Sequence, residues 1–478
     1  ALLVPVSLRA QNQAPFGLSW RQIETKQFCL IYPKGAEKKA QRLANYLTKV
    51  QKKAGDSLNV KEEKITILLH NYTSMSNAFV SLAPRRAEFF HQAPPGELLG
   101  SNNWLKLLAV HEMRHVAQLE AADSGTTRMA RILYGETGWG LMAFYSTPLW
   151  VWEGDAVYTE TTFTKSGRGR MASFLRPIRT IELANKDFSY QQAYLGSRER
   201  YYPNYYHLGY LLAVHLRAEY GKDFFARVYR QTASNSFWPY AFENAIKRET
   251  NKSIEELYRE AMQAWLEKWK KQNNTIAPEP KGVELTHRKP VRSWTNYTTL
   301  QKLNDGTFAA IEQSLHLPQR IVKLSQKKNS FKIETLQYVH QLSTETISAA
   351  QDLIAWSEHE TDIRWQKKKH SVVKILNRQT NKVYELRKKS NLFSPTLHPQ
   401  KSKLAAVACP FAKPCGITIL ESRSGETLSK LTLPGGAHAQ SPTWAQFNEQ
   451  EAIYFILIQD GTRKIARWLP EENNNFTK

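Results

Sequence analysis

Cysteine is scarce in this sequence, which has only three among 478 residues. So few cysteines cannot build a disulfide-stapled scaffold, and the fold must therefore depend on hydrophobic cores. Cys29 lies within the apolar run 28–32 and is expected to be a buried strand residue. Cys409 and Cys415 bracket a loop with two prolines, and they could close a local disulfide in an oxidising compartment.

Long apolar runs are also missing. Beyond the first ten residues, no stretch approaches the roughly 18 uncharged apolar residues that span a bilayer, so we expect no transmembrane segment. The opening 1–10 ends in the small residue Ala10 and is followed by a polar triplet, which is typical of the end of a signal peptide. An ordinary apolar strand is the alternative. The first interpretation predicts a secreted or periplasmic protein whose given sequence begins inside its signal peptide.

Acidic residues are outnumbered, with 43 Asp and Glu against 66 Lys and Arg, and the formal net charge is +23. Such an excess favours contact with anionic partners. The basic residues are nevertheless dispersed, and neither a zinc knuckle nor a Gly-rich phosphate loop occurs. We therefore expect a solvated basic surface and no nucleic-acid partner.

The hydrophobic pattern divides the chain into parts. Strand-like runs at 28–32, 65–69 and 77–80 surround an amphipathic helix that ends near Gly55, and a mostly helical pattern follows over 104–271. Within that region, Ser253 and Glu256 are spaced as a capping box at the start of a helix. A polar, proline-containing stretch at 272–285 predicts a linker.

Beyond the linker, short apolar runs alternate with turn residues. The runs begin at 308, 353, 404 and 453, so they recur every 45–51 residues. The triplet Ser-Pro-Thr at 394–396 returns at 441–443. Several short strands in a period of this length predict the blades of a β-propeller, and about four repeats predict one that is incomplete in this chain.

The strongest local motif is His-Glu-Met-Arg-His, from His111 to His115. Histidines four residues apart lie on one face of a helix, where both imidazoles can bind one metal ion. Glu112 between them could accept a proton from a water molecule that the metal activates. The alternative is a pair of ordinary histidines on a core or surface helix.

A third ligand is expected from the segment 148–158. There Glu153 stands among Trp, Val, Ala and Tyr, and a buried carboxylate is costly unless it is paired or coordinated. A zinc ion held by the two histidines would supply the partner that Glu153 needs. The alternative is a salt bridge to a nearby arginine such as Arg114.

Together, the His-Glu-x-x-His helix and the later Trp-x-x-Glu-Gly-x-Ala-x-Tyr pattern resemble the gluzincin metallopeptidases of the peptidase-MA-like superfamily. The resemblance covers residues 16–271 and places the edge strand of the N-terminal subdomain near 77–80. It implies one Zn²⁺ per chain, with His111, His115 and Glu153 as its ligands and Glu112 as the general base. The second half resembles TolB-type or WD40-like propeller repeats.

The same resemblance points to a tyrosine three residues before a glycine on a later helix. This position matches Tyr206, which could donate a hydrogen bond to the oxyanion. Tyr205 and His207 are alternative candidates for the same role. Arg114 and Asp155 depart from the usual family pattern, in which uncharged residues stand at these places. Neither occupies a ligand position, so the departures bear on specificity more than on zinc binding.

These observations predict an α+β zincin-like metallopeptidase domain followed by an all-β propeller. The expected divisions are a tail at 1–15, the metallopeptidase domain at 16–271, a linker at 272–285 and propeller repeats at 286–478. The expected activity is zinc-dependent hydrolysis of peptide or protein substrates. The alternative is a weak or inactive zincin whose propeller binds a protein partner in the cell envelope. A serine hydrolase is disfavoured because no Gly-x-Ser-x-Gly motif occurs.

Overall fold

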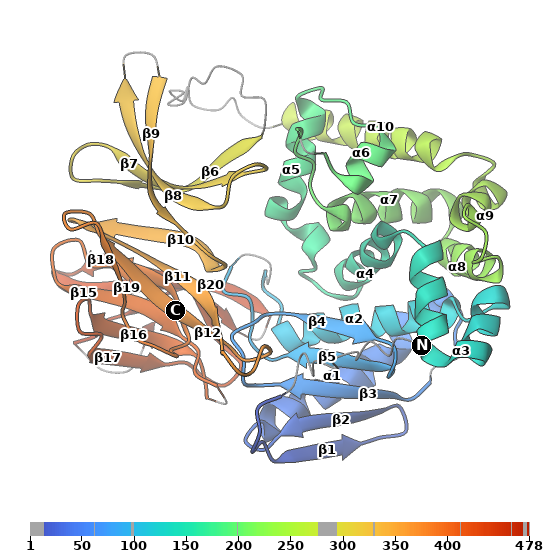
Figure 1. Ribbon diagram of the computed structural model, residues 1–478, viewed down its shortest axis with the longest axis horizontal. Coiled ribbons are helices and arrows are strands. Elements are labelled where there is room, and N and C mark those ends of the chain that lie inside the picture. The colour runs from blue at the N-terminus through green and yellow to red at the C-terminus, as the bar shows by residue number, and fades with distance from the viewer. Residues whose placement is uncertain are drawn as a thin grey trace, which may run out of the picture.

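The computed structural model of the protein describes residues 14–61, 63–96, 100–197, 199–275, 294–327, 330–411, 413–459, 461–471 and 476–477. The signal-peptide remnant predicted at 1–15 lies almost wholly outside these residues, and so does most of the linker predicted at 272–285. Figure 1 shows a mixed sheet with its helices, a group of further helices, and a series of small sheets.

The first part of the chain forms a five-stranded sheet in the order β1-β2-β3-β5-β4. Its strands are β1 (Trp20–Glu24), β2 (Phe28–Pro33), β3 (Ile65–His70), β4 (Ala78–Ser81) and β5 (Arg86–Phe90). The central pairs β2–β3 and β3–β5 are parallel, whereas β1 and β4 pair antiparallel with their neighbours. The predicted strands correspond to β2, β3 and β4, and β4 is an edge strand, as the family resemblance implied.

Two long helices, α1 (Glu37–Gly55) and α2 (Trp104–Ala121), pack with this sheet. Apolar residues of α1 recur at helical spacing, and Ala40, Leu43 and Leu47 are fully buried among them. A short 3-10 helix, η1 (Asp56–Leu58), follows α1. The prediction for Cys29 was wrong in part, because side chains alternate along β2 and Cys29 lies on its half-exposed side.

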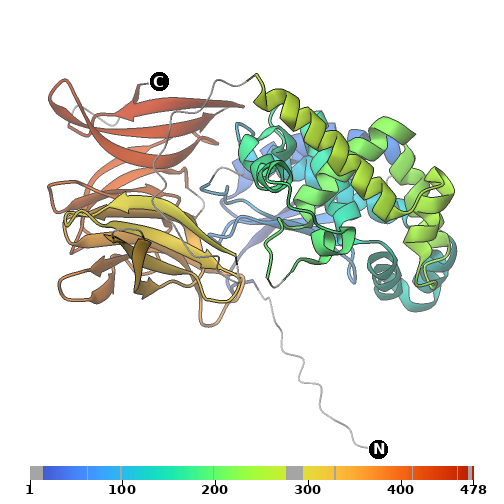
Figure 2. The same cartoon turned by 90° about the horizontal axis from the view of Figure 1, so that it is seen from above.

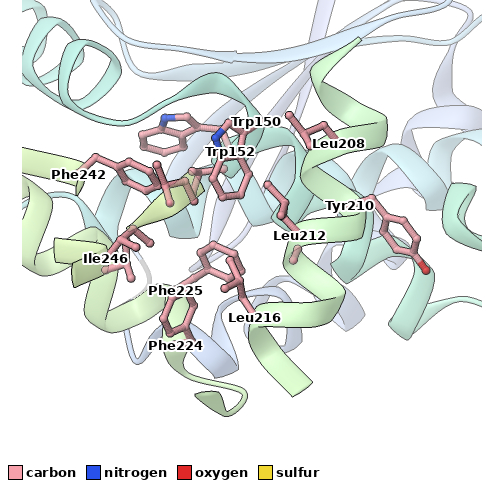
Figure 3. Packing of buried hydrophobic residues seen from close by; sticks show 14 of the residues in the cluster. Trp150, Trp152, Leu208, Tyr210, Leu212, Leu216, Phe224, Phe225, Phe242 and Ile246 are labelled. Atoms are coloured by element: carbon pink, nitrogen blue, oxygen red, sulfur yellow. The ribbon is translucent and has the colours of Figure 1, made fainter. Parts of the chain in front are cut away.

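The remaining helices form a second core, shown in Figure 3, in which Trp150, Leu212 and Phe225 are fully buried. The capping box predicted for Ser253 and Glu256 is present at the start of the last helix. The elements are α3 (Gly125–Ser146), α4 (Leu149–Phe163), η3 (Arg168–Arg170), α5 (Ala172–Leu183), α6 (Tyr190–Leu195), α7 (Tyr205–Tyr220), α8 (Phe224–Ser234), α9 (Ala241–Thr250) and α10 (Ile254–Asn273).

The second half forms four successive four-stranded antiparallel sheets. The first has β6 (Thr295–Lys302), β7 (Phe308–Ser314), β8 (Arg320–Lys327) and β9 (Ser330–Tyr338). The second has β10 (Leu342–Ala350), β11 (Leu353–Thr361), β12 (Lys369–Asn377) and β13 (Lys382–Glu385). The third has β14 (Leu392–Leu397), β15 (Lys403–Ala408), β16 (Gly416–Glu421) and β17 (Thr427–Thr432). The fourth has β18 (His438–Phe447), β19 (Gln450–Gln459), β20 (Thr462–Trp468) and β21 (Phe476–Thr477).

These sheets explain the recurrence in the sequence. The four apolar runs are the second strands of the sheets, namely β7, β11, β15 and β19. The repeated Ser-Pro-Thr lies on the first strands β14 and β18, where the pairing shifts register and Ser394 and Ser441 have positive φ. The sheets are compatible with propeller blades, and over the described residues they do not close into a ring.

The two halves of the protein lie side by side (Figure 2), and side-chain contacts join them. Glu88 on β5 is buried and accepts a hydrogen bond from Lys367 at 2.7 Å, across the boundary. Ser74 lies 2.9 Å from the Nδ1 atom of His359, and Ile458 joins the core of the five-stranded sheet. Buried polar and apolar contacts therefore both fix the second half against the first.

Cys409 and Cys415 form a disulfide, with their Cα atoms 4.2 Å apart, as the sequence predicted for this loop. The bond closes the turn between β15 and β16. Among the helices described here, none has the combination of length and apolar character that a bilayer crossing requires.

Candidate metal centre

The helices α2 and α4 bring together the three predicted ligand residues. The Nε2 atoms of His111 and His115 are 3.1 Å apart, because the two residues are separated by about one helical turn. An Oε2 atom of Glu153, on α4, lies 3.2 Å from the first of these nitrogens and 3.3 Å from the second. All three side chains thus point into one small space.

The spacing of these atoms fits a bound zinc ion. Ligand atoms at 2.0–2.1 Å from a tetrahedral zinc would be separated from one another by about 3.4 Å. The observed separations of 3.1–3.3 Å are close to this value. Since two imidazole nitrogens and a carboxylate oxygen face each other at this range, a cation between them would relieve the repulsion of their lone pairs. The donor set is also one that zinc prefers.

Each histidine is oriented through its other ring nitrogen. The Nδ1 atom of His111 is 3.1 Å from Glu160, and that of His115 is 2.7 Å from the Oε1 atom of Gln118. The Nδ1 atom of His111 is also 2.9 Å from Nη2 of Arg168. In the tautomer with the proton on Nδ1, each ring would donate to its oxygen partner and keep a lone pair on Nε2 for a metal. Carboxylates and carbonyl groups in this position are the usual partners of metal-binding histidines.

Glu160 was not identified from the sequence. It lies on α4, about two turns after Glu153, and its side chain is fully buried. Arg168 on η3 donates to both of its carboxylate oxygens, at 2.8 and 3.0 Å. Burial would raise the pKa of Glu160, but Arg168 and His111 outweigh it and lower that pKa to about 2. In the sequence, the one feature that links Glu160 to the site is its separation from Glu153 by seven residues, about two helical turns.

Glu112 is placed beside the three converging atoms. Its side chain is buried, and its Oε2 atom has no hydrogen-bond partner among the described residues. Burial raises its pKa, while His111 and His115 act in the opposite direction. An unpartnered carboxylate oxygen is costly in the interior, and this one belongs to a residue that lines the cavity.

Three residues were candidates for the oxyanion donor, and of these Tyr206 lines the cavity that contains the proposed metal ligands. Its ring lies parallel to that of His111, with centroids 6.5 Å apart, and burial together with the nearby Glu153 raises its pKa well above the usual range. His207 is directed elsewhere, because its ring stacks on Phe174 and its Nδ1 atom contacts Asn204. Tyr205 stacks on Tyr206 but does not line the cavity.

Two glycines allow Tyr206 to reach this position. Gly154 on α4 and Gly209 on α7 lie at a close helix crossing, and a Cβ atom added to Gly154 would be 2.1 Å from the backbone of Gly209. Gly154 directly follows Glu153, and Gly209 follows Tyr206 by three residues. Because neither glycine has a side chain, the two helices approach closely, and Tyr206 of α7 lies beside Glu153 of α4.

The cavity at the site has a volume of about 260 Å³. Its lining includes the edge strand β4 with the preceding residue Asn77, and also the apolar side chains of Phe144 and Leu149. Because β4 pairs with β5 on one side only, the backbone groups along its other edge are available to an extended chain.

Arg114 and Asp155, which depart from the family pattern, bind each other rather than the site. The guanidinium group of Arg114 donates to both oxygens of Asp155, at 2.8 and 3.0 Å. The alternative in which Arg114 pairs with Glu153 is therefore wrong, since Glu153 faces the two histidines.

No protein-family model matches the chain, and no curated protein does. Parts of it are similar to solved structures. The β-propeller domain of the Trilobed protease from Pyrococcus furiosus has 14% identity and a TM-score of 0.26, over 38% of this chain and 56% of that one. A puromycin hydrolase mutant complexed with PGG has 12% identity and a TM-score of 0.23, over 35% and 26%. A prolyl endopeptidase has 13% identity and a TM-score of 0.26, over 38% and 26%.

These overlaps span little more than half of the first of those proteins and about a quarter of the other two. The likenesses are too low to assign an activity, which must be inferred from the geometry of the site itself.

Proposed function

We propose that the protein is a zinc-dependent metallopeptidase of the gluzincin type, with one Zn²⁺ held by His111, His115 and Glu153. The observation that supports this best is the convergence of three donor atoms at 3.1–3.3 Å, with Glu112 lining the same cavity. Structural zinc sites use four protein ligands, whereas three leave a position open for chemistry.

The residues around the site have distinct tasks in peptide hydrolysis. A bound zinc supplies Lewis acidity, which polarises a water molecule and the scissile carbonyl group. Glu112 takes the proton from the attacking water and passes it to the departing amine. Tyr206 donates a hydrogen bond from its hydroxyl group to the oxygen on which negative charge develops. A tyrosine hydroxyl is protonated at neutral pH, and burial of Tyr206 raises its pKa further.

The substrate is an extended peptide segment. Strand β4 borders the cavity and has a free edge, so a peptide can pair with its backbone as an added strand. Such pairing fixes the carbonyl group near Glu112 without depending on the peptide sequence. The apolar lining residues Phe144 and Leu149 favour apolar side chains in the substrate.

The proposal includes export from the cytoplasm. The disulfide between Cys409 and Cys415 supports it, because such bonds persist in oxidising compartments such as the bacterial periplasm. The propeller-like sheets are proposed to bind a protein partner or to guide the substrate. If the chain holds zinc and cleaves nothing, the alternative of an inactive zincin with a binding propeller is favoured.

Metal analysis combined with a broad peptide-cleavage screen tests the proposal. The wild type should contain about one zinc per chain and cleave peptides, and both properties should be lost in His115→Ala because only two protein ligands remain. His316→Ala is the control, since His316 is exposed and does not line the cavity. Zinc retained at the wild-type level in His115→Ala would contradict the proposed ligand set.

A further inference from the structure

A second cavity, of about 410 Å³, lies between the two halves of the protein and is separate from the zinc site. It is bordered by the first turns of α1 and α2 on one side. On the other side it meets the disulfide loop and the residues that lead into β18. Its basic lining residues are Lys38, Lys39, Arg42, His91, Lys413 and His438.

The positive charge in this cavity is not balanced by acidic side chains. Among the described lining residues, only Glu37 is acidic, and its carboxylate is already engaged with Arg21 at 3.3 Å and with the Gly35 amide at 3.1 Å. The Nζ atom of Lys39 contacts the Nε2 atom of His91 at 3.3 Å. Among the described residues, Arg42 donates a hydrogen bond to a backbone carbonyl, that of Gly435, at 3.4 Å.

The cationic groups disfavour one another's charge. Burial and the charge of Arg42 lower the pKa of Lys39 to about 8. Burial, Lys39 and Arg42 lower the pKa of His438 to about 4, and burial with Lys39 also lowers the pKa of His91 to about 3. A bound anion would reverse these effects, because an opposite charge nearby favours the protonated form of each group.

Two helix ends add to the positive potential. Helices α1 and α2 both begin at the cavity, and neither N-cap residue, Ala36 or Asn103, makes a side-chain capping hydrogen bond. The first turn of α1 contains the acidic Glu37, whereas that of α2 contains no acidic residue. The unpaired N–H groups of a helix N-terminus favour anions. The side chains of Trp104, Leu105 and Pro414 provide apolar surface beside these groups.

From the cavity, its unbalanced cations and the two helix ends, we propose that this site binds a small organic anion carrying carboxylate or phosphate groups. The volume lies within the range of small-molecule pockets, about 300–1,000 Å³. The anionic groups contact Lys39, Arg42 and the histidines, and the carbon skeleton lies against Trp104. Because both halves of the protein contribute, the bound anion holds them together.

Isothermal titration calorimetry on the full chain at pH 6 tests the proposal, with citrate and inorganic phosphate as separate probes. At least one probe should bind saturably, and the heat should change with the ionisation enthalpy of the buffer, because the histidines take up protons on binding. Stronger binding of citrate identifies a carboxylate ligand, and stronger binding of phosphate identifies a phosphate ligand. Lys39→Met should weaken binding at least tenfold. Lys49→Met, on an exposed position of the same helix, should leave it unchanged.

A stability measurement separates loss of the site from loss of the fold. Without added anion, Lys39→Met should have a Tm equal to or above that of the wild type, since a poorly solvated charge has been removed. The saturating probe should raise the Tm of the wild type and of Lys49→Met but not that of Lys39→Met. Absence of saturable binding of both probes up to 10 mM would overturn the proposal, and so would equal binding by Lys39→Met.

Discussion

Arg114 and Asp155 form a buried, bidentate ion pair that joins the two helices on which the proposed zinc ligands lie. Both side chains are at most 1% exposed. Arg217 donates a further hydrogen bond to Asp155 at 2.6 Å, and Gln118 contacts both Asp155 and His115. The pair therefore fixes the separation of α2 and α4, on which the spacing of the three ligand atoms depends.

Replacing Asp155 by Asn should destabilise the protein strongly. Burial alone would raise the pKa of Asp155, but Arg114 and Arg217 outweigh it and lower that pKa to about 2. Without the carboxylate, two buried guanidinium groups lose their counter-charge, which typically costs about 3–5 kcal/mol. Chemical denaturation measures the change, and Glu260→Gln in the exposed Lys252–Glu260 pair is the control, expected to shift the midpoint little. A midpoint for Asp155→Asn equal to that of the control would contradict the structural role.

Glu160→Gln should weaken zinc binding without removing a ligand. The Oε2 atom of Glu160 lies 3.1 Å from Nδ1 of His111, and loss of such a partner of a metal-binding histidine typically lowers metal affinity by about 10- to 100-fold. Competition with a chelator of known affinity measures the effect. Glu182→Gln is a suitable control, because it changes a partly buried glutamate that does not line the site. Unchanged affinity in Glu160→Gln would show that Glu160 serves only the ion pair with Arg168.

Tyr206→Phe should lower kcat and retain zinc. Removal of one donor to the oxyanion typically costs about 10²–10³ in kcat, whereas the ligand set is untouched. Tyr205→Phe is the matched control, since the neighbouring ring does not line the cavity. If Tyr205→Phe shows the larger loss, the two tyrosines have been assigned in the wrong order.

The stability of the protein should also depend on pH through Glu182. Burial, and then Asp187, raise the pKa of Glu182 from 4.5 to about 7. Between these values the folded state binds more protons than the unfolded state, so this group makes the protein less stable as the pH rises from about 4.5 to 7. In Glu182→Gln that contribution should vanish, which denaturation midpoints at several pH values will show. An identical pH profile in wild type and variant would exclude Glu182 as the source.

The sequence predicted much of the fold because its signals were local. Helix α1, strands β2 and β3 and the second strand of each four-stranded sheet follow from apolar spacing alone. The position of Cys29 was misjudged because an apolar run does not reveal which side of a strand faces the core.

The site was predicted in part for a related reason. His111 and His115 were predicted as a pair from their helical spacing. Glu153 was predicted from a different argument, namely that a buried carboxylate is costly unless it is paired. The contacts of Glu160 with Arg168, and of Arg114 with Asp155, join residues on different elements. Such pairs depend on how helices pack, and no spacing in a single sequence encodes them.

Zinc content and peptide cleavage measured together for the wild type and Glu112→Gln test the central proposal most directly. The substitution preserves the size of the side chain and all three proposed ligands, so zinc should stay near one per chain. The proton acceptor is lost, and kcat should fall by about 10²–10⁴. Cleavage by Glu112→Gln at the wild-type rate, with zinc bound in both proteins, would contradict the assignment of Glu112 as the general base.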